Sequence, residues 1–253
     1  MSLLQVQQLS KSFGGVAALE ELSFALPAGQ MLALIGPNGA GKSTCFNLIN
    51  GQLRPDRGEV LLDGQSITGL DARRIWRRGV GRTFQISAAF SSMTVLQSVQ
   101  AALLSHHGRL WQLWRPADSL FRQQAMELLD QVGMAAQAQR ACAVLAYGDI
   151  KRVELAMALS NAPRLLLMDE PTAGMATQER QALMALTRRL VNERGMAVLF
   201  TEHSMDVVFA HADRILVLAR GQLVADGAPA VVRADARVRE LYFGSGASFG
   251  GAA

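Results

Sequence analysis

The chain has 253 residues, of which 50% are hydrophobic and 18% charged, and its formal net charge is +4. A disordered chain would contain fewer apolar residues and more uncompensated charge, so we expect a folded globular protein. No apolar run reaches the roughly 18 residues that cross a bilayer, and the N-terminus lacks the features of a secretory signal, which predicts a cytoplasmic protein. Basic and acidic residues are interspersed, so we expect no nucleic-acid partner despite the positive charge.

Strand-like segments dominate the beginning of the chain. They lie at residues 4–9, 22–26 and 31–35. Turns between them are expected at Gly14-Gly15 and at Pro27-Ala28-Gly29. A glycine-rich loop comes next, followed by an amphipathic helix at about 42–50 and a strand at 58–63 that Gly64 closes.

The pattern changes to helical periodicity between residues 94 and 131, with a breaker at Pro116 and a further helix from about 148 to 160. This predicts a helical subdomain at about 90–160. Strands and helices then alternate, in the order strand 165–168, helix 177–193, strand 196–201, helix, strand 215–218. Such alternation favours a mainly parallel sheet covered by helices. We expect one domain over residues 1–243 and a flexible tail at 244–253.

The glycine-rich loop lies between an apolar strand and a helix, which is the context that the phosphate-binding pattern G-x-x-x-x-G-K-[ST] requires. Glycines let successive backbone N–H groups face one anion, and the N-terminus of the following helix adds a favourable dipole. Lys42 can reach the β- and γ-phosphates of a nucleotide, and the Ser43 hydroxyl can bind Mg²⁺. The predicted nucleotide-binding residues are Gly36, Pro37, Asn38, Gly39, Ala40, Gly41, Lys42, Ser43 and Thr44.

Two carboxylates, Asp169 and Glu170, follow the apolar strand at 165–168. Ligands of open α/β sheets bind at the carboxyl ends of the strands, so both side chains are expected near the nucleotide. Asp169 would hold Mg²⁺ through water, and Glu170 would polarise the water that attacks the γ-phosphate. Together with the glycine loop, the pair indicates a P-loop nucleotide hydrolase or kinase.

Five further segments narrow this class. Their sequences are K-S-F-G-G at 11–15, G-R-T-F-Q at 81–85, L-A-Y-G-D at 145–149, P-T-A-G at 171–174 and T-E-H at 201–203. They resemble, in this order, the aromatic loop, glutamine loop, signature sequence, D-loop and switch histidine of the ATP-binding subunits of ABC transporters. The resemblance runs from about residue 3 to residue 244. It implies an α/β P-loop NTPase fold with a RecA-like, mainly parallel core, an antiparallel β subdomain and an inserted helical subdomain.

The resemblance also implies roles for individual residues. Phe13 would stack on adenine, and Gln85 would sense Mg²⁺ and the γ-phosphate, joining Ser43 and Asp169 at the metal. His203 would lie near the γ-phosphate and assist hydrolysis of ATP with Glu170 and Gln85. The signature residues would act on nucleotide held by a second, head-to-tail ATPase subunit, identical or different; they are Leu145, Ala146, Tyr147, Gly148 and Asp149.

The implied partners are membrane permease subunits and, indirectly, a periplasmic binding protein, at the cytoplasmic face of the bacterial inner membrane. The permease would dock beside Gln85 and the region 88–96. Within the family, the chain is most similar to subunits of branched-chain amino acid importers, on the segments 81–85, 93–96, 145–148 and 238–244. Relatives that carry urea, short amides or lipopolysaccharide share much of this pattern, and the cargo stays open.

Two rival functions differ from transport in the motifs that they require. ABC ATPases that act on ribosomes usually have two cassettes, and those that act on DNA have a long coiled coil, whereas this chain has one glycine loop and a compact helical region. A small P-loop kinase would not need an L-x-x-G signature or a histidine after its last core strand.

The chain departs from the usual signature L-S-G-G-Q at Ala146, Tyr147 and Asp149. The usual serine donates to the γ-phosphate, a hydrogen bond worth roughly 1.5–3 kcal/mol that Ala146 cannot make. The Gly148 N–H and the helix dipole remain, so we expect weakened closure of the dimer. Asp149 favours its helix terminus as an early helix residue. Ala176 stands where the D-loop usually has an aspartate or asparagine.

Overall fold

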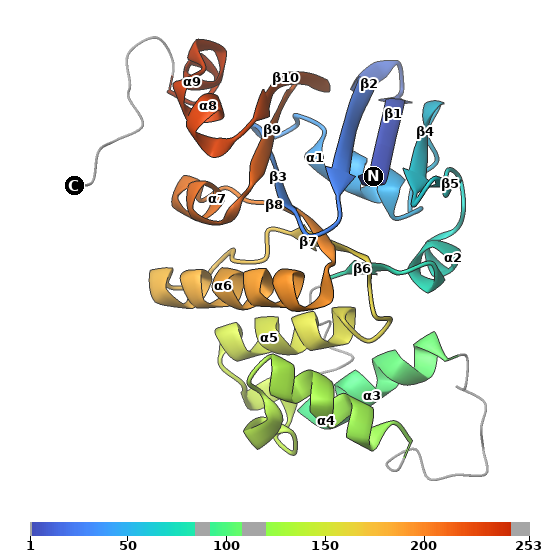
Figure 1. Cartoon of the computed structure of the whole chain (residues 1–253), viewed down its shortest axis with the longest axis vertical. Coiled ribbons are helices and arrows are strands. Elements are labelled where there is room, and N and C mark those ends of the chain that lie inside the picture. The colour runs from blue at the N-terminus through green and yellow to red at the C-terminus, as the bar shows by residue number, and fades with distance from the viewer. Residues whose placement is uncertain (1, 84–91, 108–119, 244–253) are drawn as a thin grey trace.

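Two β-sheets and a layer of helices organise the chain (Figure 1). The computed structural model describes residues 2–83, 92–107 and 120–243. Gln85, Pro116 and the expected tail at 244–253 lie outside the described residues.

The smaller sheet is antiparallel, with the strand order β2-β1-β4-β5. Its strands are β1 Ser2–Phe13, β2 Val16–Pro27, β4 Arg57–Leu62 and β5 Gln65–Ser66. Gly14 and Gly15 join β1 to β2 with φ values of 55° and 84°, the left-handed conformation that a tight hairpin needs. The predicted antiparallel subdomain and its Gly-Gly turn are confirmed.

The larger sheet has the order β10-β9-β3-β8-β7-β6. Its strands are β3 Met31–Ile35, β6 Val80–Arg82, β7 Leu165–Asp169, β8 Ala197–Thr201, β9 Arg214–Ala219 and β10 Gln222–Gly227. Every pairing is parallel except that of β10 with β9. The prediction of a mainly parallel sheet is confirmed. Its strands therefore point their carboxyl ends toward one edge, where a ligand can meet several of them.

The antiparallel strand β10 was not predicted. A two-residue turn of Arg220 and Gly221 joins it to β9, with φ values of 50° and 81°. Two successive positive φ values are typical of the hairpin turn that Asn-Gly or Asp-Gly usually forms. Arg-Gly is a weaker signal, so the sequence indicated a turn at Gly221 without indicating the strand that follows.

The helices lie at α1 Lys42–Ile49, α2 Ala72–Arg77, α3 Val95–His106, α4 Arg122–Gln131, α5 Tyr147–Ala158, α6 Thr177–Arg194, α7 Met205–His211, α8 Pro229–Ala234 and α9 Ala236–Phe243. α3 begins with a capping box, in which Thr94 and Gln97 exchange side-chain to backbone hydrogen bonds of 3.2 and 3.0 Å. The sequence did not indicate α2 and α8, because six residues are too few to display a helical period.

Both faces of the parallel sheet are buried, and successive residues of each central strand enter different hydrophobic clusters. Met31, Ala33 and Ile35 of β3 belong to one cluster, whereas Leu32 and Leu34 belong to the other. The first cluster includes side chains of α3, α4, α5 and α6, and the second includes α1 and the antiparallel sheet. The parallel strands thus connect the helical layer to the rest of the molecule (Figure 1).

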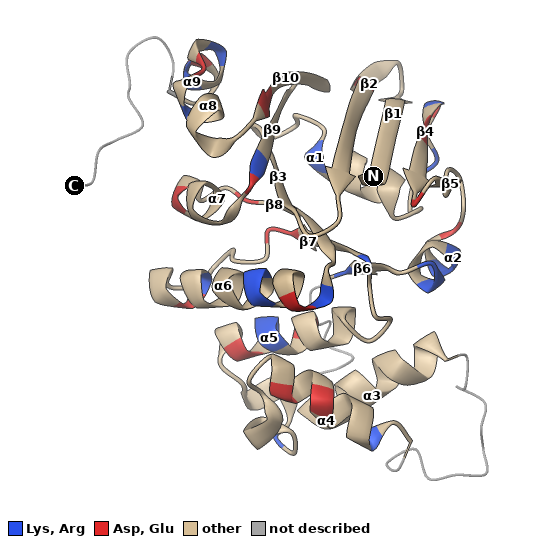
Figure 2. Cartoon of the chain, viewed as in Figure 1, with Lys and Arg blue, Asp and Glu red and all other residues tan. Residues whose placement is uncertain are grey.

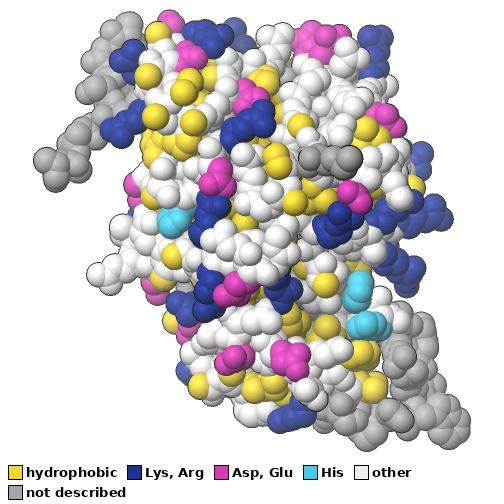
Figure 3. Space-filling model, viewed as in Figure 1, with side chains coloured by type: hydrophobic (Ala, Val, Ile, Leu, Met, Phe, Trp, Pro, Cys, Tyr) yellow, Lys and Arg dark blue, Asp and Glu magenta, His cyan; other side chains and the backbone are white. Residues whose placement is uncertain are grey.

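Basic residues gather at α2, at the right-hand edge of the view (Figure 2), and their side chains cover the surface there (Figure 3). They include Arg73, Arg74, Arg77 and Arg78, all exposed. The opposite side of this short helix is apolar, with Ile75 buried, so α2 has one face in the core and one in solvent. Among the described residues, no helix combines the length and apolarity needed to cross a membrane.

Candidate nucleotide-binding site

The glycine loop connects β3 to α1 as the sequence predicts, and at two of its positions the neighbouring backbone leaves no room for a side chain. A Cβ atom on Gly36, whose φ is 155°, would lie 2.2 Å from the carbonyl oxygen of Leu218 on β9. A Cβ atom on Gly41, whose φ is 104°, would lie 2.4 Å from the carbonyl oxygen of Ala18 on β2. The loop therefore packs directly on both sheets, and only glycine fits at these two positions.

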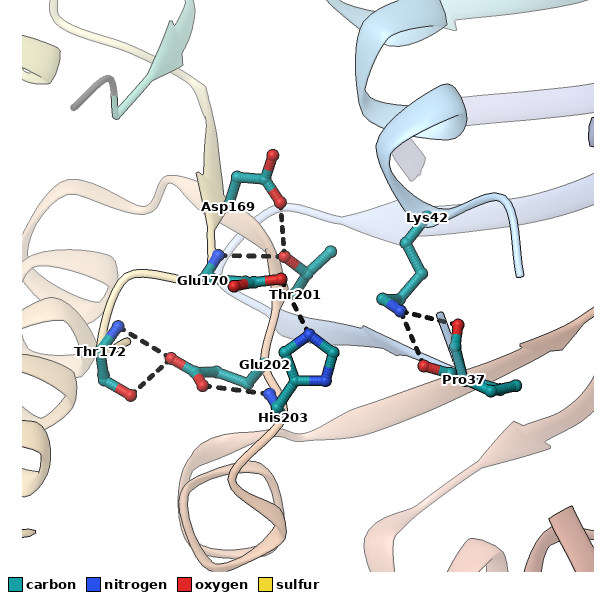
Figure 4. A network of polar contacts seen from close by, with 9 residues as sticks. Pro37, Lys42, Asp169, Glu170, Thr172, Thr201, Glu202 and His203 are labelled. Atoms are coloured by element: carbon teal, nitrogen blue, oxygen red, sulfur yellow. Dashed lines mark hydrogen bonds and ion pairs between the residues drawn. The ribbon is translucent and has the colours of Figure 1, made fainter. Parts of the chain in front are cut away.

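Lys42 is the first residue of α1, and its side chain turns back into the loop. Its Nζ atom donates hydrogen bonds to the carbonyl oxygens of Gly36 at 2.7 Å and Pro37 at 3.1 Å. The pKa of Lys42 is lowered from its usual value, because burial disfavours the charged form more than the nearby carboxylates of Glu170 and Asp169 favour it. Figure 4 shows this ammonium group on one side of the site and the carboxylates on the other.

Asp169 ends β7, and both of its carboxylate oxygens have partners. Oδ1 accepts a hydrogen bond of 2.7 Å from the hydroxyl of Thr201 on β8. Oδ2 lies 3.3 Å from the guanidinium of Arg82 on β6. Neighbouring parallel strands thus fix the orientation of this carboxylate, because their carboxyl ends lie side by side.

Glu170 follows immediately and has a φ of 47°, an uncommon left-handed conformation for a non-glycine residue. Its backbone N–H donates to the Thr201 hydroxyl at 3.0 Å, and its Oε1 atom lies 2.8 Å from Nε2 of His203. The side chains of Glu170 and His203 remain 43% and 52% exposed. Strain at such a residue persists where surrounding contacts impose it, and it is frequent at functional sites.

Glu202 supports this arrangement from inside the protein, since it is only 4% exposed. Its Oε1 atom accepts hydrogen bonds from the backbone N–H of Thr172 at 2.9 Å and from the Thr172 hydroxyl at 2.6 Å. Its Oε2 atom accepts from the backbone N–H of His203 at 3.2 Å. The carboxylate therefore joins the segment after β7 to the segment after β8 (Figure 4).

We expect Thr201→Val to lower the melting temperature by about 2–10 °C, because the hydroxyl that joins Asp169 to the Glu170 backbone is lost. Thr201 is 1% exposed, so water cannot readily replace it. Differential scanning calorimetry measures the effect. Thr187→Val is the matched control, since this buried hydroxyl donates only to the Leu183 carbonyl one helical turn away. Equal melting temperatures for the two variants would contradict the bridging role.

A cavity of about 390 Å³ opens between the strand ends and α5. Its lining residues are Ser43, Arg82, Thr83, Tyr147, Lys151, Glu154, Asp169, Glu170 and Ala173. Ser43 and Asp169 bring a hydroxyl and a carboxylate to one polar space, and such hard oxygen donors suit Mg²⁺. The loop amides and Lys42 supply groups that bind phosphates, so the site has the chemistry for a nucleotide with its metal.

The segment predicted to be the signature leads into α5. Leu145 is buried, and Ala146 precedes the helix as its N-cap residue without a side-chain hydrogen bond. Asp149 lies in the first turn, as expected, and its Oδ2 atom accepts a hydrogen bond of 3.1 Å from Gln137. Tyr147 is 46% exposed, with the Lys151 ammonium 5.4 Å from its ring centroid.

Phe13 lies at the end of β1 with 47% of its surface exposed, so its ring is accessible. The Lys11 ammonium is 5.6 Å from the ring centroid. Of the residues expected to dock a permease, 88–91 lie outside the described residues, as does Gln85. Val95 and Leu96 are buried in the helical layer, so these two side chains do not present a docking surface.

Sequence reasoning assigned no roles to four residues that organise the site: Arg82, Thr172, Thr201 and Glu202. Each acts through a partner at least 30 positions away in the chain. All four residues stand inside the motif segments 81–85, 171–174 and 201–203, and this position in the chain was the signal that could have found them.

Known proteins are similar to this chain over most of its length. The "ABC transporter" family model matches residues 19–173. The high-affinity branched-chain amino acid transport ATP-binding protein BraF of Pseudomonas aeruginosa is 36% identical over 96% of this chain and 98% of its own length. The corresponding LivG protein of Escherichia coli K12 is 35% identical, again over 96% and 98%. A phosphonates import ATP-binding protein, PhnC 2 of a Synechococcus strain, is also 36% identical, over 90% of this chain and 86% of its own.

Solved structures give the same result. The crystal structure of a nucleotide-free ATP-binding cassette from an ABC transporter has a TM-score of 0.87 and 29% identity, covering 97% of this chain and 100% of that one. A cassette in its ADP conformation has a TM-score of 0.87 and 30% identity, with the same coverage. The P-loop NTPase fold is thus confirmed, and the small-kinase alternative is set aside. The chain belongs to the ABC transporter ATPase family, whose characteristic activity is ATP hydrolysis, and is an ATP-binding subunit homologous to those of branched-chain amino acid importers.

Proposed function

We propose that this subunit powers the import of branched-chain or other hydrophobic amino acids through a separate permease. Residues 1–243 would form one ATPase domain, with the helical subdomain at about 90–160 as an insertion. It would work at the cytoplasmic face of the bacterial inner membrane, and a periplasmic binding protein would deliver the cargo from the other side. The observation that carries the proposal is the set of strand-end residues around one cavity, in a chain similar over nearly its full length to such subunits.

The nucleotide would bind along the glycine loop. Backbone amides of residues 36–44 would surround its phosphates, Lys42 would contact the β- and γ-phosphates, and Phe13 would stack on adenine. Mg²⁺ would be held by Ser43 and Asp169, with Gln85 as a further ligand, and it would neutralise charge on the phosphates. The proximity of a hydroxyl and a carboxylate in one cavity supports this assignment.

Hydrolysis would begin with a water molecule between Glu170 and the γ-phosphate. The Glu170 carboxylate would polarise this water and accept its proton. His203, 2.8 Å from Glu170, would orient the carboxylate and contact the γ-phosphate. Because these two side chains are partly exposed, they are accessible to a second subunit that closes over the nucleotide.

That second ATPase subunit would complete the site by supplying its own signature helix. In this chain, the first turn of α5 would face the partner's nucleotide; Gly148 is buried in this structure, and a Cβ atom on it would lie 3.1 Å from Oε1 of Glu179, so the backbone there would become accessible only when the dimer forms. Ala146 has no hydroxyl to donate, so closure would depend on the backbone and the helix dipole. A different ATPase subunit with a serine at this position would compensate in a heterodimer, and a homodimer is the alternative.

The alternative cargoes are urea or short amides, lipopolysaccharide, and phosphonates. Phosphonates are included because a phosphonate import protein is as similar in identity as the amino acid subunits. A non-transport ABC ATPase is the remaining alternative. Cargo would be selected by the permease and the binding protein, and neither is part of this chain.

Uptake of radiolabelled leucine tests the proposal in cells that carry the chain as their only copy of this subunit. We expect the wild-type chain to support uptake and Glu170→Gln to abolish it, while the affinity-purified chain brings down a polytopic membrane protein. Leucine uptake that persists in the variant, with uptake of another cargo lost, would overturn the cargo and leave the ATPase. Co-purification with ribosomes or DNA would overturn the transport function.

A further inference from the structure

Arg82 lies at the centre of a polar network beside the predicted metal site. It ends β6, and its side chain is only 14% exposed. Its guanidinium donates to Oδ1 of Asn47 on α1 at 3.0 Å and to Oε1 of Gln52 just after α1 at 2.8 Å. The same group lies 3.3 Å from Oδ2 of Asp169. A planar guanidinium can make several such contacts at once, whereas an ammonium group cannot match this geometry.

This contact occupies the carboxylate that the proposed function assigns to magnesium. Because Oδ1 of Asp169 already accepts from Thr201, the guanidinium lies at the other oxygen. An ionised carboxylate has about four acceptor positions, so a metal-bound water still has room. However, a divalent cation at this carboxylate must approach a fixed positive charge. Like charges a few ångströms apart repel strongly where solvent is partly excluded.

We infer that Arg82 is a resident counter-ion of Asp169 that makes metal binding depend on nucleotide. The inference rests on the proposed function, since it concerns the same metal site. With the phosphates absent, Arg82 neutralises the carboxylate and keeps affinity for a bare divalent cation low. With a triphosphate present, the added negative charge outweighs the repulsion, and metal and nucleotide bind together. Arg82 also orients Asp169, because its other contacts fix the guanidinium to α1 and the segment after it.

Mn²⁺ serves as the probe, because the electron paramagnetic resonance signal of free Mn²⁺ reports how much remains unbound. In nucleotide-free protein, we expect Arg82→Gln to lower the Mn²⁺ dissociation constant about tenfold, since one positive charge is removed. Arg82→Lys keeps the charge but loses the planar guanidinium, so its Mn²⁺ dissociation constant should stay within about twofold of the wild-type value. Arg164→Gln is the matched control: it breaks a 2.9 Å ion pair with Asp63 on the exposed surface and should change nothing.

A second measurement compares ATP affinity with Mg²⁺ and with EDTA by isothermal titration calorimetry. The dissociation constant in EDTA divided by the constant with Mg²⁺ should be larger in wild type than in Arg82→Gln, because the coupling between metal and nucleotide is reciprocal and Arg82 is inferred to strengthen it. If both Arg82 variants bind Mn²⁺ more weakly than wild type, Arg82 only positions Asp169 and the inference is overturned. Should Arg82→Gln fail to fold, Arg82→Lys decides alone, because a tenfold change with the charge retained would exclude the counter-ion role. Wild-type protein that binds no ATP would instead contradict the proposed function.

Discussion

Glu170→Gln should slow ATP turnover on the order of 10²-fold or more while ATP still binds. Glutamine has nearly the same shape, and the backbone hydrogen bond from residue 170 to Thr201 does not involve the side chain. The amide cannot accept a proton from water, so the step assigned to the carboxylate is lost. Steady-state phosphate release and equilibrium binding of a fluorescent ATP analogue measure the two quantities separately.

Glu193→Gln provides the matched control for this variant, because its side chain is exposed on α6 and lies 3.9 Å from Arg189. We expect its turnover to equal that of wild type. Wild-type hydrolysis by Glu170→Gln would remove Glu170 from the mechanism. Loss of ATP binding in that variant would instead indicate that the carboxylate holds the site together.

Lys42→Ala should raise the dissociation constant for ATP by roughly 30-fold to several thousand-fold, the cost of removing one partner of a buried charge pair. In the proposed site the ammonium group would be the charge nearest the phosphates, and it also holds the loop through hydrogen bonds to the carbonyl oxygens of Gly36 and Pro37. Calorimetric titration of ATP with Mg²⁺ measures the change. Loss of the positive charge and loss of the loop hydrogen bonds both weaken ATP binding, so the decrease in affinity should be large.

Lys42→Met separates the effect of charge from that of packing. Lys42 is only 8% exposed, so its apolar stem is buried, and methionine keeps most of that stem. We expect the methionine variant to fold like wild type and to bind ATP as weakly as the alanine variant. Tight binding by Lys42→Met would show that the loop amides alone hold the phosphates. Melting temperatures of both variants show whether the loop itself has been damaged.

Local sequence determined the parts of the site that lie within one motif. The strand–loop–helix around Lys42 was predictable because apolar periodicity, glycine spacing and a helix start agree over about fifteen residues. Asp169 and Glu170 were predictable because a short apolar strand that ends in carboxylates, in a chain with such a loop, is typical of a nucleotide site. These assignments depend on residues that are adjacent in the chain.

Contacts between distant segments were not predictable. The Arg82–Asp169 pair spans 87 positions, and it exists only because β6 and β7 are neighbours in the sheet. Glu202 was assigned no role from the sequence, whereas it is a buried acceptor for three donors. The packing of distant elements decides both the Arg82–Asp169 pair and the contacts of Glu202, and a single sequence does not specify that packing.

The alternation of side chains along the central strands limits how this protein can be recombined with its relatives. Met31, Ala33 and Ile35 pack with the helical layer, although 60 or more positions separate them from α3. A chimera that exchanges only residues 92–158 would therefore meet strand surfaces shaped for the original helices. The alternate positions on β3, β7 and β8 that contact these helices would have to be exchanged as well. The boundary between the two parental sequences would then fall between neighbouring residues of one strand.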